Sequence, residues 1–247
     1  MIQLELPPKP EALNDVLIEE LTEQYKKEGT AVWKKDFLVD AVSEIAFGKC
    51  CYSECRLGEE GKYVELDHFY PKKYFPDRVV EWGNLVPSNK KCNTTKGDHN
   101  PEIEPIINPF ESPKPHLYIA NYRFYPKTEI GRATIETVAL NDRQHFLNKR
   151  SAIGNKVSEI LNDIYDEIND NGAVLINAPY RKRKLIRNLK SLMDEAGRKN
   201  IYSATISTVI LTDEYYPKIE QFFIENNLWD DEFVGLKDEL IFCSLLK

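Results

Sequence analysis

The sequence has no long apolar run. None of its 247 residues belongs to a stretch that approaches the ~20 consecutive apolar residues of a membrane helix. The N-terminal segment also lacks the apolar core of a secretory signal peptide. These absences predict a cytoplasmic protein with no membrane partner. Its 42% hydrophobic and 30% charged residues are typical of an ordinary folded chain rather than a disordered one.

Cysteine is scarce, and its count is odd. The five cysteines are Cys50, Cys51, Cys55, Cys92 and Cys243. Because the chain shows no export signal, free thiols or metal ligands are expected rather than disulfides.

An excess of positive charge is missing as well. The net charge is −7, whereas a protein that grips long nucleic-acid duplexes unaided normally carries a basic face. The most basic run, Arg181–Lys184 with Arg187 and Lys190, begins a predicted helix whose opposite side is apolar. This run is either a solvated helix face or a contact surface for a nucleic-acid backbone or an acidic partner.

Helical patterns of apolar residues cover both ends of the chain. Two helices are expected within residues 10–48. Apolar stripes over 153–168 and 185–196 predict two more, the first ending at Asn171-Gly172 and the second opening at Pro179. Weaker helical segments follow to the C-terminus.

Strands are expected in the middle of the chain. Residues 63–68 and 82–86 predict two opposing strands. A short helix follows, with Ser88 as its N-cap, and it runs to Lys96 and ends at Gly97. The order is strand, loop, strand, helix.

A proline-rich segment and a hairpin come next. Five prolines exclude helix and central strand from residues 101–115. Residues 118–125 and 132–140 predict the two strands of a hairpin, with the loop over 126–131.

Polar residues with catalytic potential are concentrated in three segments. They are Leu66–Lys72 (LDHFYPK), Trp82–Ser88 (WGNLVPS) and Asn89–Asp98 (NKKCNTTKGD). Phosphodiester hydrolysis needs a base that takes a proton from water near neutral pH, and histidine fits this task. It also needs a hard cation against the developing negative charge, and such a cation prefers carboxylate and amide oxygens.

The segments supply these groups. Asp67 and His68 are adjacent at the end of a predicted strand, so their side chains point to opposite faces. One can hold a metal ion while the other addresses water. Asn93, midway along the short helix, can supply a second metal ligand through its amide oxygen.

Three further polar residues have candidate roles. Asn84, on the facing strand, is placed to form a hydrogen bond that orients the loop or the imidazole of His68. Lys96 lies one helical turn beyond Asn93 and can reach a substrate phosphate. His99, close by in the sequence, is a second candidate for a phosphate contact.

These segments resemble the HNH, or ββα-metal, nuclease motif in its HNN form, because Asn93 stands where many members have the final histidine. The resemblance implies that His68 is the general base and that Asp67 and Asn93 bind Mg²⁺ or Mn²⁺. It also implies that Asn84 is the middle asparagine that positions His68. The implied substrate is a nucleic acid, either DNA or RNA.

Outside the motif, the sequence resembles the PtuB-like HNH proteins. Residues 48–54 (GKCCYSE) are similar to the Gly-Lys-Cys-x-Tyr-Cys-Glu start of that family. Other segments that fit it are Lys96-Gly97-Asp98, Ile107-Asn108-Pro109, Thr134-Ile135-Glu136 and Leu140-Asn141. The resemblance implies an endonuclease subunit that acts beside a PtuA-like ATPase in Septu anti-phage defence, or in a retron system.

Many members of that family hold a structural Zn²⁺ with two Cys-x-x-Cys pairs. Here Ser53 and Asn89 stand at the positions of two of those cysteines. A closed zinc site needs four ligands. The remaining candidates are Cys50, Cys55 and Cys92, with Cys51 as a substitute. The alternative is a set of packed free thiols.

The expected fold class is α+β, with a small ββα-metal HNH core in a mostly helical protein that also has a β-hairpin and a C-terminal helical bundle. The expected division is N-terminal helices over residues 1–48, the HNH core over 49–115, and the hairpin and helical region over 116–247. Two functional alternatives stay open. One is a stand-alone HNH restriction-type DNase, and the other is a non-catalytic assembly module that retains the HNH scaffold.

Overall fold

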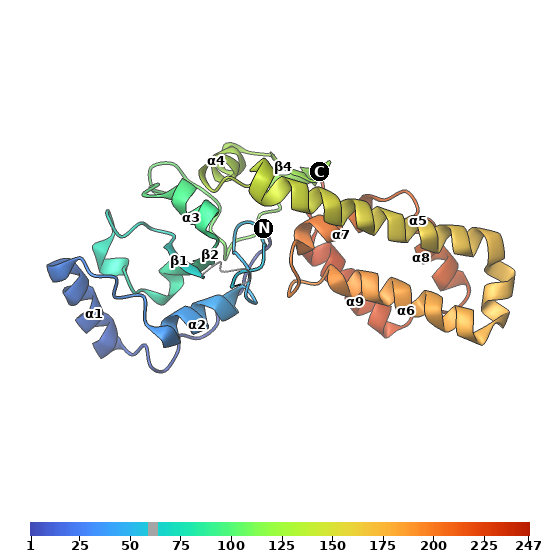
Figure 1. The fold of residues 1–247 in the computed structure, drawn as a ribbon, viewed down its shortest axis with the longest axis horizontal. Coiled ribbons are helices and arrows are strands. Elements are labelled where there is room, and N and C mark those ends of the chain that lie inside the picture. Colours follow the sequence, from blue (N-terminus) through green and yellow to red (C-terminus); the bar gives the residue numbers. More distant parts are fainter. Residues whose placement is uncertain (59–63) are drawn as a thin grey trace. The chain divides into compact units, whose positions relative to one another are not determined.

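The computed structural model describes residues 1–58 and 64–247 (Figure 1). The first residue of the strand expected over 63–68 lies outside them. The chain divides into two compact units. Unit 1 comprises Met1–Tyr118 and Phe124–Phe146, and unit 2 comprises Ile119–Arg123 and Leu147–Lys247. The chain therefore passes between the units three times.

Helices and two-stranded sheets together confirm the expected α+β class. The expected N-terminal helices belong to the same unit as residues 49–115, and that unit continues to Phe146. Among the described residues, no helix has both the length and the apolar character that a bilayer span requires.

Unit 1 begins with the two expected helices, α1 (Asp15–Glu28) and α2 (Asp36–Ile45). The side chain of Asn14 caps α1 by accepting a hydrogen bond from the Leu17 amide (2.9 Å). Gly29 ends α1 in the left-handed region, with φ of +67°.

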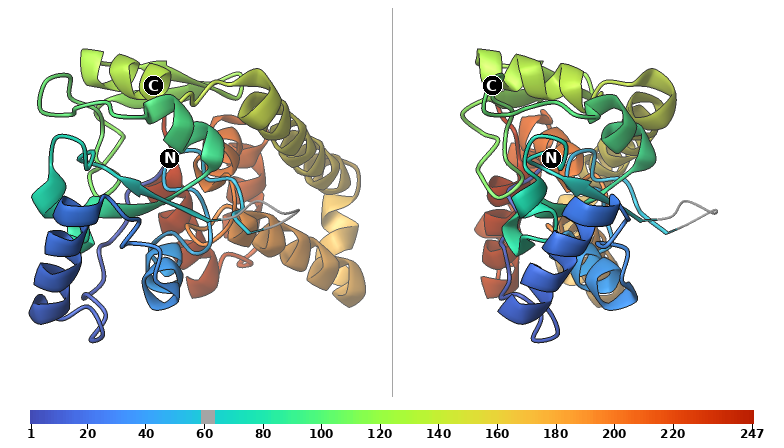
Figure 2. Two further views of the ribbon diagram at one scale, coloured as in Figure 1. Left: turned by 60° about the vertical axis from the view of Figure 1, so that its left-hand side comes forward. Right: turned by 90° about the vertical axis from the view of Figure 1, so that its left-hand side faces the viewer.

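The centre of unit 1 has the predicted order of strand, loop, strand and helix. Strand β1 (Glu65–His68) pairs antiparallel with β2 (Leu85–Ser88), and His68 lies opposite Leu85. Helix α3 (Lys90–Lys96) follows. α2 contacts β2 and α3 contacts β1, so the two helices flank the strands (Figures 1 and 2).

Two boundaries in this region differ from the prediction. The loop between the strands holds the 3₁₀ turns η1 (Pro76–Arg78) and η2 (Trp82–Asn84), so β2 starts only at Leu85. Ser88 ends β2, and Asn89 caps α3 by accepting from the Lys91 amide (2.8 Å). Serine and asparagine both cap helices well, so two such neighbours leave the cap ambiguous by one residue.

The hairpin lies elsewhere than predicted. It consists of β3 (Leu117–Ala120) and β4 (Arg123–Pro126), within the segment expected to be its first strand. Its tight turn is Asn121-Tyr122, whose φ angles of +47° and +64° lie in the left-handed region that such two-residue turns need.

The segment predicted as the second strand is instead largely helical. Helix α4 (Glu129–Thr137) begins after Thr128, whose hydroxyl accepts from the Gly131 amide (3.2 Å). Thr134 and Val138 are buried four residues apart, which is a helical rather than a strand period. The cap at Thr128 was the signal that identifies this helix.

Unit 2 is a bundle of helices. They are α5 (Asn148–Asn177), α6 (Pro179–Glu195), α7 (Ser203–Thr212), α8 (Tyr216–Glu225) and α9 (Asp231–Cys243). A π-helical turn, η3 (Arg143–Leu147), precedes them. α5 packs against α6, α7 and α8, and α9 packs against α6 and α7 (Figure 1). Their apolar faces form one core, which includes Leu161, Leu185, Leu189, Ile210, Phe223 and Leu240.

The start of α6 at Pro179 is confirmed, but α5 does not stop at Asn171-Gly172. It continues to Asn177, because Leu175 in its last turns is fully buried in the core. A Cβ atom at Gly172 would lie 3.3 Å from the ring of Phe222. This glycine therefore allows a close approach between helices and does not end one.

Candidate active site

A cavity of about 600 Å³ opens in unit 1 between α2, β1 and α3. Three of the four predicted catalytic residues line it, namely Asp67, His68 and Asn93. Asn84 is not among the lining residues. The structure thus brings the predicted base and both predicted metal ligands to one cavity.

His68 is held by its Nε2 atom. This atom lies 2.9 Å from the carbonyl oxygen of Val79. Because a carbonyl oxygen can only accept a hydrogen bond, Nε2 carries the proton of the neutral ring, and Nδ1 keeps a lone pair. The ring of Trp33 meets the imidazole edge-on, with centroids 4.8 Å apart. These two contacts fix the orientation of the imidazole.

The environment of His68 favours its neutral form. Burial first, and then the positive charge of Lys72, lower the pKa of His68 to about 4, although the contact with Val79 opposes this. At neutral pH the ring is uncharged. A neutral imidazole is the form that can accept a proton from water.

Helix α1 packs against the segment that holds the His68 ring. Leu21 of α1 packs with Val32, Val79 and Val80 in a small buried cluster, and Trp33 contacts its edge. This cluster fixes the position of the Val79 carbonyl. The sequence showed no chemical role for the N-terminal helices, whereas in the structure α1 packs against the residues that contact His68.

Asp67 lies at the bottom of the site and is only 3% exposed. Its Oδ2 accepts a hydrogen bond from the hydroxyl of Tyr52 (2.8 Å), and its Oδ1 pairs with Nζ of Lys96 (3.1 Å). Burial raises the pKa of Asp67, and the charge of Lys96 and the Tyr52 hydroxyl oppose that rise. Each carboxylate oxygen keeps a further lone pair for another ligand.

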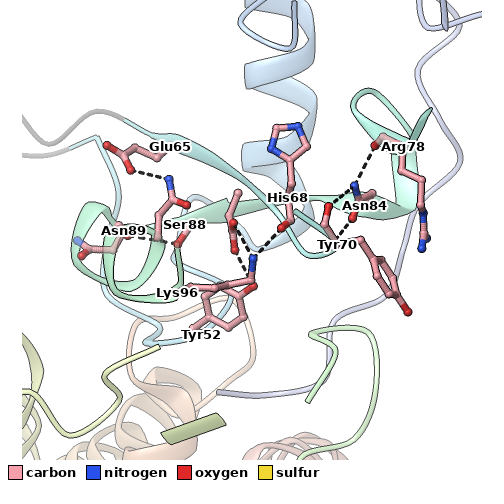
Figure 3. A network of polar contacts seen from close by, with 11 residues as sticks. Tyr52, Glu65, His68, Tyr70, Arg78, Asn84, Ser88, Asn89 and Lys96 are labelled. Carbon is pink, nitrogen blue, oxygen red and sulfur yellow. Dashed lines mark hydrogen bonds and ion pairs between the residues drawn. The ribbon is translucent and has the colours of Figure 1, made fainter. Parts of the chain in front are cut away.

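Figure 3 shows how these side chains leave β1. The ring of His68 lies on one side of the strand, and the side chains of Lys96 and Tyr52 lie on the other. Since both of the latter bind Asp67, the two neighbouring residues diverge as strand alternation predicts.

Neither Lys96 nor His99 lines the cavity. The Lys96 side chain is fully buried, and besides Asp67 its Nζ binds the carbonyl oxygen of His68 (2.7 Å). His99 does not line the cavity, and its Nε2 lies 2.7 Å from the carbonyl oxygen of Glu104. A fully buried ammonium cannot reach a bound phosphate, so the phosphate contact expected of Lys96 does not fit its position.

Asn93 is oriented by a residue that the sequence reading missed. Its Nδ2 donates to Oε2 of Glu65 (2.8 Å), which leaves the amide oxygen available for another partner. Glu65 also lines the cavity. Strand alternation was the available signal, because Glu65 precedes Asp67 by two residues and so belongs to the same face.

Asn84 ties down the loop that follows β1. Its Oδ1 accepts from the Tyr70 amide (2.7 Å). Its Nδ2 donates to the carbonyl oxygens of Tyr70 (3.1 Å) and Arg78 (2.9 Å). Of the two roles expected for this residue, these contacts correspond to orienting the loop. The loop leads to Val79, and so Asn84 acts on His68 through the backbone.

Two lysines at the cavity are better placed for a substrate than Lys96. Lys34 and Lys72 both line it. The ammonium of Lys72 lies 4.9 Å from the centroid of the Trp33 ring. The sequence reading gave no role to these cations, which lie on segments before and after β1.

Comparison with known proteins identifies a relative that is similar along almost the whole chain. No protein-family model matches it. The Septu protein PtuB of Bacillus thuringiensis is 37% identical over 234 residues, which cover 94% of this chain and 90% of that protein. This chain belongs to the PtuB family. The similarity to PtuB is not confined to the cavity, since an alignment of that length includes both units.

The four cysteines near the site of this PtuB-family chain are buried and in contact. The thiol of Cys50 contacts those of Cys51, Cys55 and Cys92, and the Ser53 hydroxyl contacts the sulfur of Cys55 (3.3 Å). Burial raises the pKa of Cys92 well above its ordinary value. Across residues 1–58 and 64–247, no three His, Cys, Asp or Glu side chains are arranged to hold a metal ion.

Replacing Asn84 with alanine in this PtuB-family chain is expected to lower the free energy of unfolding by about 2–4 kcal/mol. The substitution leaves the amide of Tyr70 and two carbonyl oxygens without their partner at a fully buried position. Chemical denaturation measures the loss. Asn100→Ala is the control, because that side chain makes one local hydrogen bond, to the Glu102 amide. Equal effects of the two substitutions would contradict the assignment.

Proposed function

We propose that this PtuB-family chain is an HNH endonuclease, which hydrolyses phosphodiester bonds in DNA or RNA with the help of a divalent metal ion. The observation that carries the proposal is the state of His68. Its ring is neutral, its Nε2 is occupied by the Val79 carbonyl, and the ring lines the same cavity as Asp67 and Asn93. A neutral imidazole and two residues with hard oxygen donors therefore line one cavity, which supports the proposal.

The donor set of the cavity fits Mg²⁺ or Mn²⁺. The carboxylate of Asp67, the amide oxygen of Asn93 and the carboxylate of Glu65 are hard oxygen donors, and all three residues line the cavity. Asp67 and Asn93 are the proposed ligands. When bound, such an ion offsets the negative charge that builds on the phosphate and the leaving oxygen.

The chain's own residues supply the proton transfer. His68 accepts a proton from the attacking water at Nδ1. The ring then becomes positively charged, and the Val79 carbonyl stabilises it through the Nε2–H bond. Lys34 and Lys72 at the cavity provide positive charge toward the substrate phosphates.

We also propose a role in anti-phage defence, as the nuclease subunit of a complex with a PtuA-like ATPase. The support is membership of the PtuB family, whose relative is described as a Septu protein. The net charge of −7 also supports an enzyme that is brought to its nucleic acid by another protein. A retron-associated complex is the variant of this arrangement in which a reverse transcriptase accompanies the ATPase.

The test uses the purified full chain, alone and with a PtuA-like ATPase from the same source, on plasmid DNA and on tRNA. Cleavage with Mg²⁺ or Mn²⁺ is expected to exceed cleavage in EDTA at least about 100-fold. Gel electrophoresis of the products measures it. Failure to cut either substrate with the partner and either ion would overturn the proposal. Equal cutting without the partner would favour a stand-alone restriction-type DNase.

A further inference from the structure

Helix α6 of unit 2 carries a concentration of positive charge that the proposed mechanism does not use. Its segment from Arg181 to Lys190 contains six basic residues and no acidic one, in a chain whose net charge is −7. Arg183 and Arg187 are exposed to solvent. The charge of this segment therefore stands out against the acidic average.

One of these cations has a structural role, which separates it from the others. Nζ of Lys190 pairs with Asp230 (2.7 Å) and with Glu232, and it lies over the ring of Phe233. Lys190 thus ties α6 to the start of α9. In the part of the chain that the structure describes, Arg183 and Arg187 have no such ion pair.

Arg183 and Arg187 lie on one face of α6, one helical turn apart. Both line a groove of about 550 Å³, together with the apolar side chains of Ile186 and Leu236. Asp194 and Glu232 also line it, and Glu232 is already paired with Lys190. Lys184 lines a different groove, with Asp163 and Glu167 opposite, so its charge has acidic neighbours.

An exposed aromatic side chain continues this face. Tyr180 is 74% exposed and precedes Arg183 by three residues and Arg187 by seven. These spacings place the three side chains on one side of a helix. A tyrosine ring in water beside two unpaired guanidinium groups is not explained by packing.

The positive charge of this segment also destabilises α6. Successive basic residues in the first turns of α6 repel one another and lie at the positive end of the helix dipole. Ion pairing within the described residues does not offset this at Arg183 or Arg187. The negative charges of a polyanionic ligand would offset this repulsion.

We propose that Tyr180, Arg183 and Arg187 form a binding surface for single-stranded nucleic acid. The two guanidinium groups contact phosphates about one helical turn, or 5.4 Å, apart, and the tyrosine ring stacks on a base. The exposed aromatic ring favours nucleic acid over an acidic protein surface, which has no base to stack. The substrate class rests on the proposed nuclease function.

The test measures binding of a labelled single-stranded oligonucleotide to the full chain in EDTA, over a range of salt concentrations. The variant is Arg183→Gln/Arg187→Gln. The control is Lys149→Gln/Lys199→Gln, which removes the same charge from exposed positions in unit 2.

The arginine variant is expected to bind about tenfold more weakly and to lower the salt slope by about 1.4, since each phosphate contact on a single strand contributes about 0.7. The control is expected to keep both values. Tyr180→Ala is expected to weaken binding about tenfold without a change in the salt slope, because stacking releases no counterions.

Unchanged binding by the arginine variant would overturn the inference, and so would an equal loss in the control. Loss of binding to the PtuA-like ATPase, with oligonucleotide binding retained, would assign the face to an acidic protein and also overturn it. Binding in EDTA does not depend on hydrolysis, so this result is independent of the nuclease proposal. His68→Ala is expected to bind the oligonucleotide like the unmodified chain.

Discussion

Replacing His68 with alanine is expected to lower the rate of phosphodiester cleavage by about 10²–10⁴-fold, the usual contribution of a positioned general base. His68 is the only histidine among the described residues that line the cavity, so no other imidazole there can replace it. The measurement is the initial rate of plasmid or tRNA cleavage with Mg²⁺, in the presence of the ATPase partner.

Alanine also removes the ring that packs against Trp33, so a second variant separates chemistry from folding. His68→Gln keeps a side-chain donor for the Val79 carbonyl but has no basic nitrogen, and it is expected to be equally inactive. His99→Ala is the matched control outside the cavity and is expected to keep the full rate. A His68→Gln chain that folds and cuts normally would favour the non-catalytic assembly module.

Replacing Lys96 with methionine is expected to lower the free energy of unfolding by about 3–5 kcal/mol. The pair between Lys96 and Asp67 is buried on both sides, with side-chain exposures of 0% and 3%. Methionine fills a similar volume but leaves the Asp67 carboxylate without its cation and the His68 carbonyl without its donor. Chemical denaturation monitored by circular dichroism measures the change.

Two controls define the cause of this loss. Lys90→Met, at an exposed position of the same helix, is expected to change stability by less than about 0.5 kcal/mol. The double variant Asp67→Asn/Lys96→Met is expected to recover part of the stability, because it buries no unpaired charge. It is not expected to recover cleavage, since Asp67 is a proposed metal ligand. A double variant less stable than Lys96→Met alone would contradict the pairing argument.

The order of β1, β2 and α3 could be predicted because its signals are local. Alternation marks β1, and Gly97 marks the end of α3. Adjacent residues on a strand diverge for steric reasons, so the opposite directions of Asp67 and His68 were predictable too.

The groups that hold these side chains could not be predicted. Val79 follows His68 by 11 residues in an irregular loop, and Tyr52 precedes Asp67 by 15. No period in the sequence relates such pairs. The small core that joins α1 to Val79 holds the first of these contacts in place, and this core becomes visible only in the folded chain.

The misplaced hairpin and the misplaced end of α5 share one cause. A single polar or glycine residue is compatible with several local structures, and tertiary packing determines which of them forms. Gly172 allows a close approach to Phe222 inside α5, whereas Gly29 ends α1. Asn121 forms a turn within a segment that alternates like one continuous strand.

The triple passage of the chain between units limits how the protein can be dissected. A fragment that starts at Leu147 would omit Ile119–Arg123, which belongs to the same unit. Within that unit the Tyr122 hydroxyl binds Asn155 (2.6 Å), and the Tyr122 carbonyl accepts from Nε of the buried Arg150 (3.0 Å). Separately expressed halves would therefore each be incomplete, and limited proteolysis at a single peptide bond would not release an intact C-terminal half.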